Sequence, residues 1–313
     1  MCFSLERGMM LNPAFPRQGQ ESQLSRYVLA AELSERAFEE NASLCNGAEL
    51  RLQAVYAEEL WKKVRSLALA NLDWRKLDVL DICCGSGFLS FHLLSRIHPA
   101  SLTLLDASRS ELEEAEVLLT KHYPEMKPTY VRADLIESGL ASGSFDLIIG
   151  NSFLHHLYDM PGAVSEFRRL LKPGGAFVTL HEPTPAAIAY ESGRWDLVAQ
   201  FLAEGPGYVE RLRRERSAGI CSGVDVWLLE HQTIRDVFEG EGFEHVIAEG
   251  WHIFRPFVVA AMKLHLHREK PMLTQWETIL LQLAIGADAL LRSILPPRAF
   301  GSLALSARKP ATS

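Results

Sequence analysis

The sequence predicts an α/β fold with a mostly parallel sheet, and three observations support this. From about residue 77 onward, short runs of strand formers alternate with amphipathic, helix-like stretches. The first run leads directly into a glycine turn, VLDICCGSGF at residues 79–88, as strand–turn–helix units do. The alternation breaks twice, after about residues 183 and 252, where tryptophan-rich or apolar helical segments intervene. Strands alternating with helices indicate crossover connections and therefore parallel pairing.

The expected elements follow in chain order. Seven strands are predicted, at residues 79–82, 102–108, 129–135, 145–152, 175–183, 243–248 and 303–306. A helix over 108–121 begins with a capping serine, Ser108 or Ser110. Another covers 161–171 with Pro161 in its first turn, and a third covers 232–241.

These elements divide the chain into a core and three additions. We expect a helical N-terminal cap region at 1–76, and a ligand-binding core at 77–183 that continues at 230–252. An insertion that acts as a lid is expected at 184–229 and a helical insertion at 253–299. The last strand and the tail occupy 300–313.

Composition narrows the classes of function. The 313 residues carry a net charge of −7, which argues against a nucleic-acid partner. The five cysteines are odd in number and lack zinc-site spacing, so we expect reduced thiols, no bound metal and a cytoplasmic protein. The start shows no signal-peptide pattern. Residues 279–295 are apolar but interrupted by Gln282, Asp288 and Arg292, so no membrane span is expected.

The glycine turn indicates a nucleotide-type ligand, because glycine lets a ligand approach the backbone closely. A dinucleotide fingerprint would place a third glycine where Ser90 stands, and a P-loop would need Gly-Lys-Ser/Thr. Asp81 would repel a pyrophosphate and attract an ammonium group. Asp106 and Asp134 follow the next two strands, where carboxylates suit a ribose and an adenine amino group. A ligand with an amino group, a ribose and an adenine but no phosphate fits S-adenosylmethionine.

With these motifs in order, the chain resembles the class I S-adenosylmethionine-dependent methyltransferases, and most of all the small-molecule methyltransferases similar to those of ubiquinone and menaquinone biosynthesis. The resemblance rests on VLDICCGSGF, LLDAS, VRADL, FDLIIGNSFLHHLYD and RRLLKPGGAFV, across about residues 77–182. It implies a Rossmann-like fold whose last strand is antiparallel. The chain departs from the family pattern at Cys83, where the family has glycine.

The resemblance also implies the residues that bind the cofactor. The methionine end would lie against the turn at Asp81, Cys83, Gly85, Ser86 and Gly87. The ribose would lie at Asp106 and Ala107, and the adenine at Asp134 and Leu135. Asn151, Ser152 and Phe153 would lie near the sulfonium. S-adenosyl-L-homocysteine would be the product.

The acceptor side is expected at His155, His156, His181 and Glu182, which follow the fourth and fifth strands. We predict His181 as general base and His155 as the second choice, with Glu182 orienting the imidazole. For each histidine taken alone, simple packing is the competing interpretation. On a helix, His155 and His156 would point roughly 100° apart, so at most one would face the acceptor.

The additions predict a hydrophobic small-molecule acceptor. They contribute a set of aromatic residues that suits an apolar lid: Trp195, Trp227, Trp251, Phe254, Phe257 and Trp276, with Tyr27, Tyr158 and Tyr190 as weaker candidates. A homodimer interface, a second core, or a helix lying on a membrane surface are the alternatives for these helices.

The predicted function is therefore methyl transfer to O, C or N of a hydrophobic natural-product-like or quinone-like molecule. Two alternatives remain open at this point. One is methylation of protein or RNA. The other is a protein that binds S-adenosylmethionine without transferring its methyl group, which Cys83 in place of glycine keeps in consideration.

Overall fold

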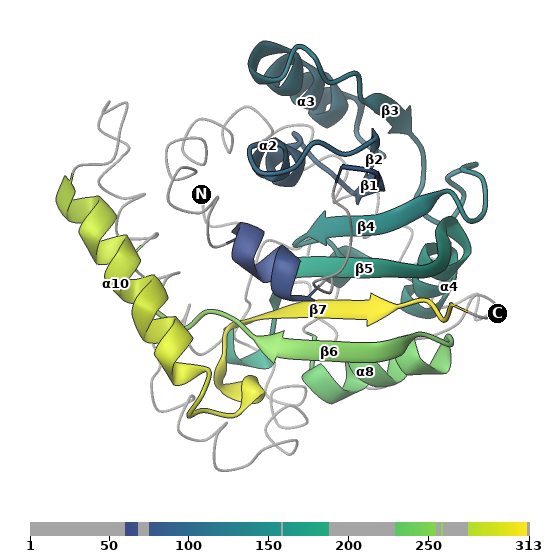
Figure 1. Ribbon diagram of the computed structural model, residues 1–313. Coiled ribbons are helices and arrows are strands. Elements are labelled where there is room, and N and C mark those ends of the chain that lie inside the picture. Colours follow the sequence, from purple (N-terminus) through teal and green to yellow (C-terminus); the bar gives the residue numbers. More distant parts are fainter. Residues whose placement is uncertain are drawn as a thin grey trace, which may run out of the picture.

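The computed structural model describes residues 60–67, 75–157, 159–187, 229–254, 258 and 275–311. Within them a seven-stranded sheet has the order β3-β2-β1-β4-β5-β7-β6 (Figure 1). Its strands are β1 Asp78–Ile82, β2 Ser101–Asp106, β3 Thr129–Arg132, β4 Phe145–Asn151, β5 Leu171–Pro183, β6 Glu244–Gly250 and β7 Ser302–Arg308.

The first five strands pair in parallel, and β7 lies antiparallel between β5 and β6. The predicted mostly parallel sheet with an antiparallel last strand is therefore confirmed. The carboxyl ends of β1, β2, β4 and β5 lie at one edge of the sheet, where α/β folds bind ligands.

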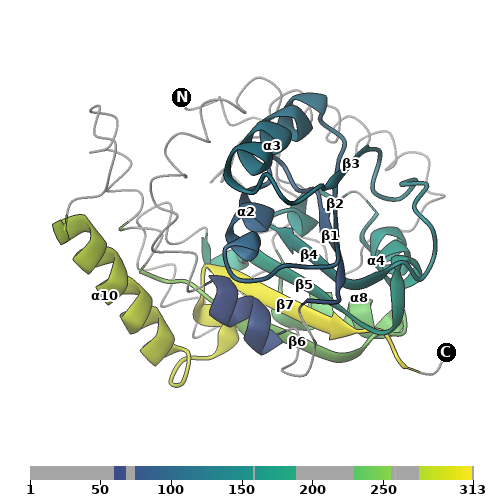
Figure 2. The same cartoon turned by 45° about the horizontal axis from the view of Figure 1, so that its top comes forward.

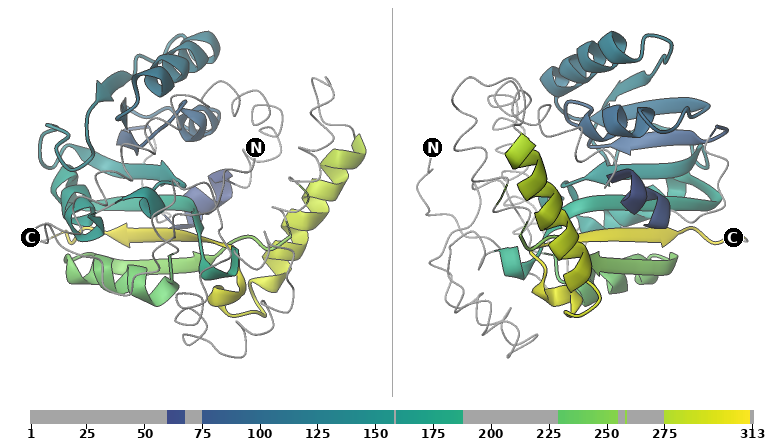
Figure 3. Two further views of the ribbon diagram at one scale, coloured as in Figure 1. Left: turned by 180° about the vertical axis from the view of Figure 1, so that it is seen from behind. Right: turned by 60° about the vertical axis from the view of Figure 1, so that its left-hand side comes forward.

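Helices cover both faces of the sheet (Figures 1 and 2). Helices α2 Phe88–Leu94 and α3 Arg109–His122 pack on one face together with helical residues 60–67, and α4 Met160–Leu170 and α8 His231–Gly240 pack on the other. The 3-10 turns η1 Leu154–His156 and η2 Pro297–Ala299 complete this part. Helix α10 Gln275–Leu291 lies beyond the sheet, at the end where β4 and β6 finish (Figures 1 and 3).

Local sequence explains where the helices begin. Ser108 caps α3 by accepting a hydrogen bond from the Glu111 backbone N–H, which settles the choice between Ser108 and Ser110. Asp159 caps α4 through the Gly162 N–H, and Pro161 lies in its first turn as predicted. One of the four unpaired N–H groups at the start of each helix is thus satisfied by a side chain.

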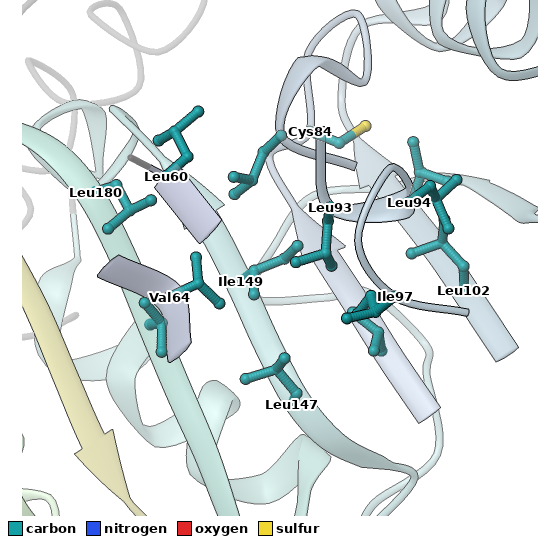
Figure 4. Close-up of a cluster of buried hydrophobic side chains, with 14 of the residues drawn as sticks. Leu60, Val64, Cys84, Leu93, Leu94, Ile97, Leu102, Leu147, Ile149 and Leu180 are labelled. Atoms are coloured by element: carbon teal, nitrogen blue, oxygen red, sulfur yellow. The ribbon is translucent and has the colours of Figure 1, made fainter. Parts of the chain in front are cut away.

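The two faces of the sheet carry separate apolar clusters. Figure 4 shows the first, in which Leu60 and Val64 of the N-terminal helix lie near Leu180 and Ile149 of the central strands. All four are at most 3% exposed. The second cluster packs α4 and α8 against the other face through aromatic rings, including the stacked Phe167 and Phe177. Burial on both faces explains why the central strands read as continuous apolar runs.

The structure corrects three strand boundaries and leaves other boundaries untested. Strands β2 and β3 end at Asp106 and Arg132, before their predicted ends at 108 and 135. Strand β5 begins at Leu171, so the Lys-Pro-Gly-Gly segment after α4 belongs to the strand; Gly174 allows this with φ +78°. The lid at 184–229 lies outside the described residues except at its two ends, as do most of 1–76 and of 253–274. Among the described helices, none has the length and apolar character that a membrane span requires.

Candidate active site

The turn after β1 holds its backbone in a left-handed conformation at three positions. Cys83, Gly85 and Gly87 have φ of +49°, +50° and +75°. Two of these are glycines, which adopt such angles without strain, whereas a side chain there costs roughly 1–2 kcal/mol. Cys83 therefore takes the strained conformation at a position where the resembling family has glycine. The Cys84 N–H donates to the Leu105 carbonyl and attaches the turn to β2.

The two glycines have different surroundings. A Cβ atom on Gly87 would lie 2.9 Å from the Cβ of Ala115, so Gly87 is required where α2 meets α3. A Cβ on Gly85 would meet only the Glu111 Oε2, at 3.5 Å. Backbone accessible to a ligand is therefore found at Gly85, and Ser86 beside it is also partly exposed. Gly87 is buried and is needed for packing, and its predicted contact with the ligand stays a prediction.

Asp81 is only 1% exposed and lies beneath the turn. Its Oδ2 accepts hydrogen bonds from the Ser90 N–H and hydroxyl at 3.1 and 2.6 Å. Burial raises the pKa of this carboxyl to about 7, against the opposing effect of the Ser90 hydrogen bonds. The carboxylate thus stabilises the first turn of α2, and contact with a ligand amino group remains a prediction.

Asp106 ends β2 and spans the turn with both carboxylate oxygens. Oδ2 accepts from the Gly85 N–H at 2.8 Å and Oδ1 accepts from the Ser108 N–H at 2.9 Å. A carboxylate has about four acceptor positions, so Asp106 retains acceptor capacity for hydroxyl donors. The neighbouring Ala107 is exposed.

The third predicted carboxylate follows β3. The Asp134 Oδ1 accepts from the Ile136 N–H at 2.8 Å, and its side chain is exposed. The Ala133 N–H donates to the Asp106 carbonyl, which brings the segment after β3 beside the end of β2. Leu135 is 7% exposed and belongs to the apolar core.

Negative charge surrounds the turn. The pKa of the Cys83 thiol is raised well above its usual value by burial and by the charges of Asp106, Asp134, Asp81 and Glu182. Cys83 is therefore a protonated thiol, and the four carboxylates form an environment that favours a cation and disfavours a phosphate.

The segment after β4 contributes the next group of residues. Asn151 is partly exposed, and Ser152 has φ +58° with its N–H donating to the Leu180 carbonyl. The Phe153 side chain is 3% exposed and packs edge-on against the stacked rings of Phe167 and Phe177. Its ring occupies the space that a Cβ on Gly150 would fill. Phe153 is thus a core residue whose backbone alone is near the site.

Glu182 is fully buried and is bound to the segment after β4. Oε1 accepts from the Phe153 and Leu154 N–H groups and from the Thr179 hydroxyl, and Oε2 lies 2.8 Å from His155 Nδ1. Burial alone would raise the pKa of Glu182, but the hydrogen bonds from His155, Thr179 and Leu154 hold it below its usual value. Of the two histidines predicted as bases, Glu182 binds the second choice, His155, and the role of His181 as a base stays a prediction.

The two adjacent histidines also differ from expectation. His155 and His156 lie on a 3-10 turn, and their ring centroids are 3.9 Å apart at a 46° tilt. The rings contact each other instead of diverging around an α-helix. His155 is 4% exposed and held by Glu182, which favours a structural role over that of a base.

His181 has a different set of partners. Its Nδ1 lies 2.7 Å from Asn151 Oδ1 and its Nε2 lies 3.3 Å from the Nε2 of His252. The ring stacks on Trp251 with centroids 4.2 Å apart. The φ of His181 is +60°, close to the irregular register of β5 with β7 between Thr179 and Glu182. Strain at a polar residue beside a strand end is common at functional sites.

Sequence reasoning missed His252 and Asp288. His252 follows β6 and is 1% exposed, and Asp288 of α10 is fully buried. The signals were present, because His252 comes directly after a strand and Asp288 is an acid within an apolar helix.

Of the aromatic residues predicted for a lid, Trp251 lies at the site, stacked on His181 and 1% exposed. Phe254 and Trp276 are 40% and 75% exposed. Trp195, Trp227, Phe257, Tyr27, Tyr158 and Tyr190 lie outside the described residues. No group of three or more potential metal ligands occurs in the described part of the chain.

Comparison with known proteins adds family information. Residues 79–175 match the family described as "Methyltransferase domain". The chain is 32% identical to a 2-phytyl-1,4-naphtoquinone methyltransferase of Nostoc punctiforme over 34% of this chain and 47% of that protein. It is 25% identical to a demethylmenaquinone methyltransferase of Leptospira interrogans over 67% of this chain and 82% of that protein. The first of these alignments thus spans about half the length of the relative.

Among solved structures, the [4+2]-cyclase SpnF is similar with a TM-score of 0.53 at 15% identity, covering 88% of this chain and 97% of that one. This likeness supports the fold alone. The sheet order, the turn after β1 and the match at residues 79–175 together show that the core of this chain resembles class I methyltransferase domains, including those of quinone methyltransferases.

Proposed function

We propose that the chain is an S-adenosylmethionine-dependent methyltransferase that acts on a hydrophobic small molecule. The observation that supports this most is the set of acidic residues at the carboxyl ends of β1, β2 and β5 and just after β3: Asp81, Asp106, Glu182 and Asp134. A ligand with a sulfonium and an ammonium group suits this negative environment, and a dinucleotide pyrophosphate does not.

The residues at the strand ends fit this cofactor. The Asp106 carboxylate, which accepts from the Gly85 and Ser108 N–H groups, would also accept from the ribose hydroxyls. Gly85 has no side chain and little around it, so a ligand could approach its backbone. Asp134 is exposed, and it would accept from the adenine amino group. When bound, the cofactor supplies an electrophilic methyl group and leaves as S-adenosyl-L-homocysteine.

The acceptor would bind where β4 and β5 end. Asn151, Ser152, His156 and His181 are partly exposed polar residues there, and we retain His181 as the proposed base because His155 is bound to Glu182. The protein would mainly align the nucleophile with the methyl group and keep water away.

A hydrophobic, quinone-like acceptor is supported by two features. Trp251 provides an aromatic plane behind His181. Helix α10, at the same end of the sheet, carries exposed apolar side chains at Trp276, Leu280, Leu283 and Leu290. The relatives from Nostoc and Leptospira are named for naphthoquinone and menaquinone substrates.

Calorimetric titration with S-adenosylmethionine, and in parallel with NAD, tests the cofactor. We expect saturable binding of S-adenosylmethionine alone, abolished in Asp106→Ala and retained in Glu113→Gln, a control on the exposed face of α3. Binding of NAD instead would refute the proposal. Formation of S-adenosyl-L-homocysteine with a panel of phenols and hydroxylated naphthoquinones then tests transfer.

The second candidate is a protein that binds the cofactor without methyl transfer. The left-handed Cys83 in place of glycine favours it, because a side chain stands where the family leaves backbone. SpnF, which shares the fold, is named for a cyclisation. Binding without turnover across the acceptor panel would support this candidate over the first.

A further inference from the structure

A chain of four polar side chains joins helix α10 to the end of β4. Asn151 Oδ1 lies 2.7 Å from His181 Nδ1, and His181 Nε2 lies 3.3 Å from His252 Nε2. His252 Nδ1 in turn lies 3.9 Å from Asp288 Oδ2. The four residues come from separate elements, so the tertiary fold alone brings them together.

The far end of this chain is buried and charged. Asp288 is fully buried and His252 is 1% exposed. The Asp288 Oδ1 accepts from the Ile253 and Phe254 N–H groups at 3.0 and 2.9 Å, which compensates for burying a carboxylate. These bonds direct the second oxygen, Oδ2, toward His252.

The carboxylate determines where the protons lie. A neutral imidazole has one N–H and one nitrogen lone pair. The negative charge of Asp288 favours the N–H of His252 on Nδ1, so His252 Nε2 is an acceptor. His181 must then donate from its own Nε2, which leaves the lone pair of His181 on Nδ1, facing Asn151. The Asn151 amide satisfies this lone pair by presenting its NH₂ group, because amide orientation follows the hydrogen-bond network.

We propose that His252 and Asp288 are positioning residues that hold His181 in the Nε2–H tautomer, with Nδ1 as the basic atom at the end of β4. This rests on the proposed function, and it narrows the acceptor to a molecule with an acidic hydroxyl, a phenol or an enol. The acceptor O–H takes the place of the Asn151 amide at His181 Nδ1 and gives its proton to that nitrogen, an oxygen electron pair forms the bond to the methyl carbon, and the electrons of the breaking methyl–sulfur bond remain on sulfur. Asp288 stabilises the resulting imidazolium through His252.

Among the described residues, Asp288 is a carboxylate that faces His252. Glu182, next to His181 in sequence, binds His155 and the segment after β4. Arg292 of the segment after α10 donates through Nη1 to the Trp251 carbonyl. The carboxylate that faces His252 therefore comes from α10.

The test is nitrogen NMR of the full-length chain labelled in its histidine rings, at about pH 8, above the ordinary histidine pKa of ~6.5. Long-range proton–nitrogen correlations distinguish protonated from unprotonated ring nitrogens, and His181→Gln assigns the signals of His181. We expect Nδ1 of His181 to be unprotonated and Nε2 to be protonated. The reverse assignment in the unaltered protein would overturn the proposal.

Asp288→Asn removes the charge and keeps an oxygen for the Ile253 and Phe254 N–H groups. We expect this variant to lose the Nε2–H preference of His181, whereas His92→Gln, at another buried histidine, leaves it unchanged. An unaltered tautomer in Asp288→Asn would refute the positioning role. If that variant does not fold, His252→Gln provides the same comparison, because it removes the imidazole between Asp288 and His181.

Turnover separates this inference from the proposed function. With a phenolic acceptor that is methylated, Asp288→Asn should lower kcat by about tenfold or more, since a general base contributes ~10²–10⁴-fold. The KM for S-adenosylmethionine should stay the same. The predicted tautomer with no methyl transfer to any acceptor would support the positioning inference and count against the proposed function.

Discussion

Alanine substitutions at the two glycines of the turn after β1 should have opposite consequences for stability and for ligand binding. Both positions have positive φ, so an alanine at either one is strained. Only at Gly87 does the added Cβ also meet a neighbour, at 2.9 Å from the Cβ and 3.3 Å from the Cα of Ala115. At Gly85 the nearest atom is the Glu111 Oε2, at 3.5 Å.

The magnitudes follow from these contacts. Left-handed backbone costs a side chain roughly 1–2 kcal/mol, and this applies to both variants. Overpacking against a helix backbone adds about 1–3 kcal/mol, and this applies to Gly87→Ala alone. Gly87→Ala should therefore be less stable than Gly85→Ala by about 1–3 kcal/mol.

Urea unfolding followed by circular dichroism measures the difference in stability between the two variants. Calorimetric titration with S-adenosylmethionine measures their difference in affinity. We expect Gly85→Ala to lose more affinity, because its Cβ enters the accessible side of the turn. Adding Ala115→Gly to Gly87→Ala should relieve the overpacking, so the double variant should be more stable than the sum of the two single changes predicts. Equal loss of stability in the two alanine variants would refute this assignment of packing to Gly87.

Other substitutions test the buried carboxylates and the surface of α10. The pKa of Asp81 is about 7 in the folded state and 3.8 for an ordinary Asp, so the folded state binds a proton more tightly and its stability falls as the pH rises from about 4 to 7. Asp81→Asn, which keeps an acceptor for Ser90, should remove about 4 kcal/mol of this pH-dependent loss of stability. Urea unfolding at several pH values measures the difference. The pKa of Glu182 is lowered in the folded state, so its ionised carboxylate stabilises the fold above pH 4.5, and this stabilisation is lost as the pH falls through the folded-state pKa. Glu182→Gln should cost about 3–5 kcal/mol at pH 7 by breaking the pair with His155, and a cost that does not shrink in acid would contradict this. Trp276→Ser, at an exposed position, should change the unfolding free energy by no more than about 0.5 kcal/mol while weakening binding of an apolar acceptor.

Much of the fold was predictable because its signals are local. Strands buried on both faces read as apolar runs, and Ser108 and Pro161 mark helix starts by hydrogen bonding and fixed φ. The start of β5 was missed because pairing with β4 extends the strand through a proline-glycine segment that resembles a turn. Tertiary pairing determined that boundary.

The position of Asp106 at the end of a strand could be predicted from the sequence, whereas contacts between distant segments could not. Glu182 was expected to orient one of two histidines, and the sequence did not show which, because adjacent residues of a strand point to opposite faces. Glu182 therefore reaches His155, and His181 reaches His252. Asp288 looked only like an interruption in an apolar helix, since its contact with His252 depends on where α10 lies.

Backbone strain connects the observations made on separate strands. Cys83, Ser152 and His181 are non-glycine residues with φ between +49° and +60°, and they lie at or near the carboxyl ends of the neighbouring strands β1, β4 and β5. Each is fixed by its surroundings: the Cys84 N–H binds Leu105, the Ser152 N–H binds Leu180, and the buried Glu182 beside His181 accepts from Thr179 and the segment after β4. Strained conformations persist only where such contacts determine them. The same edge of the sheet therefore carries the carboxylates, the histidine chain and the strain, which is why the cofactor and acceptor roles are assigned to one site.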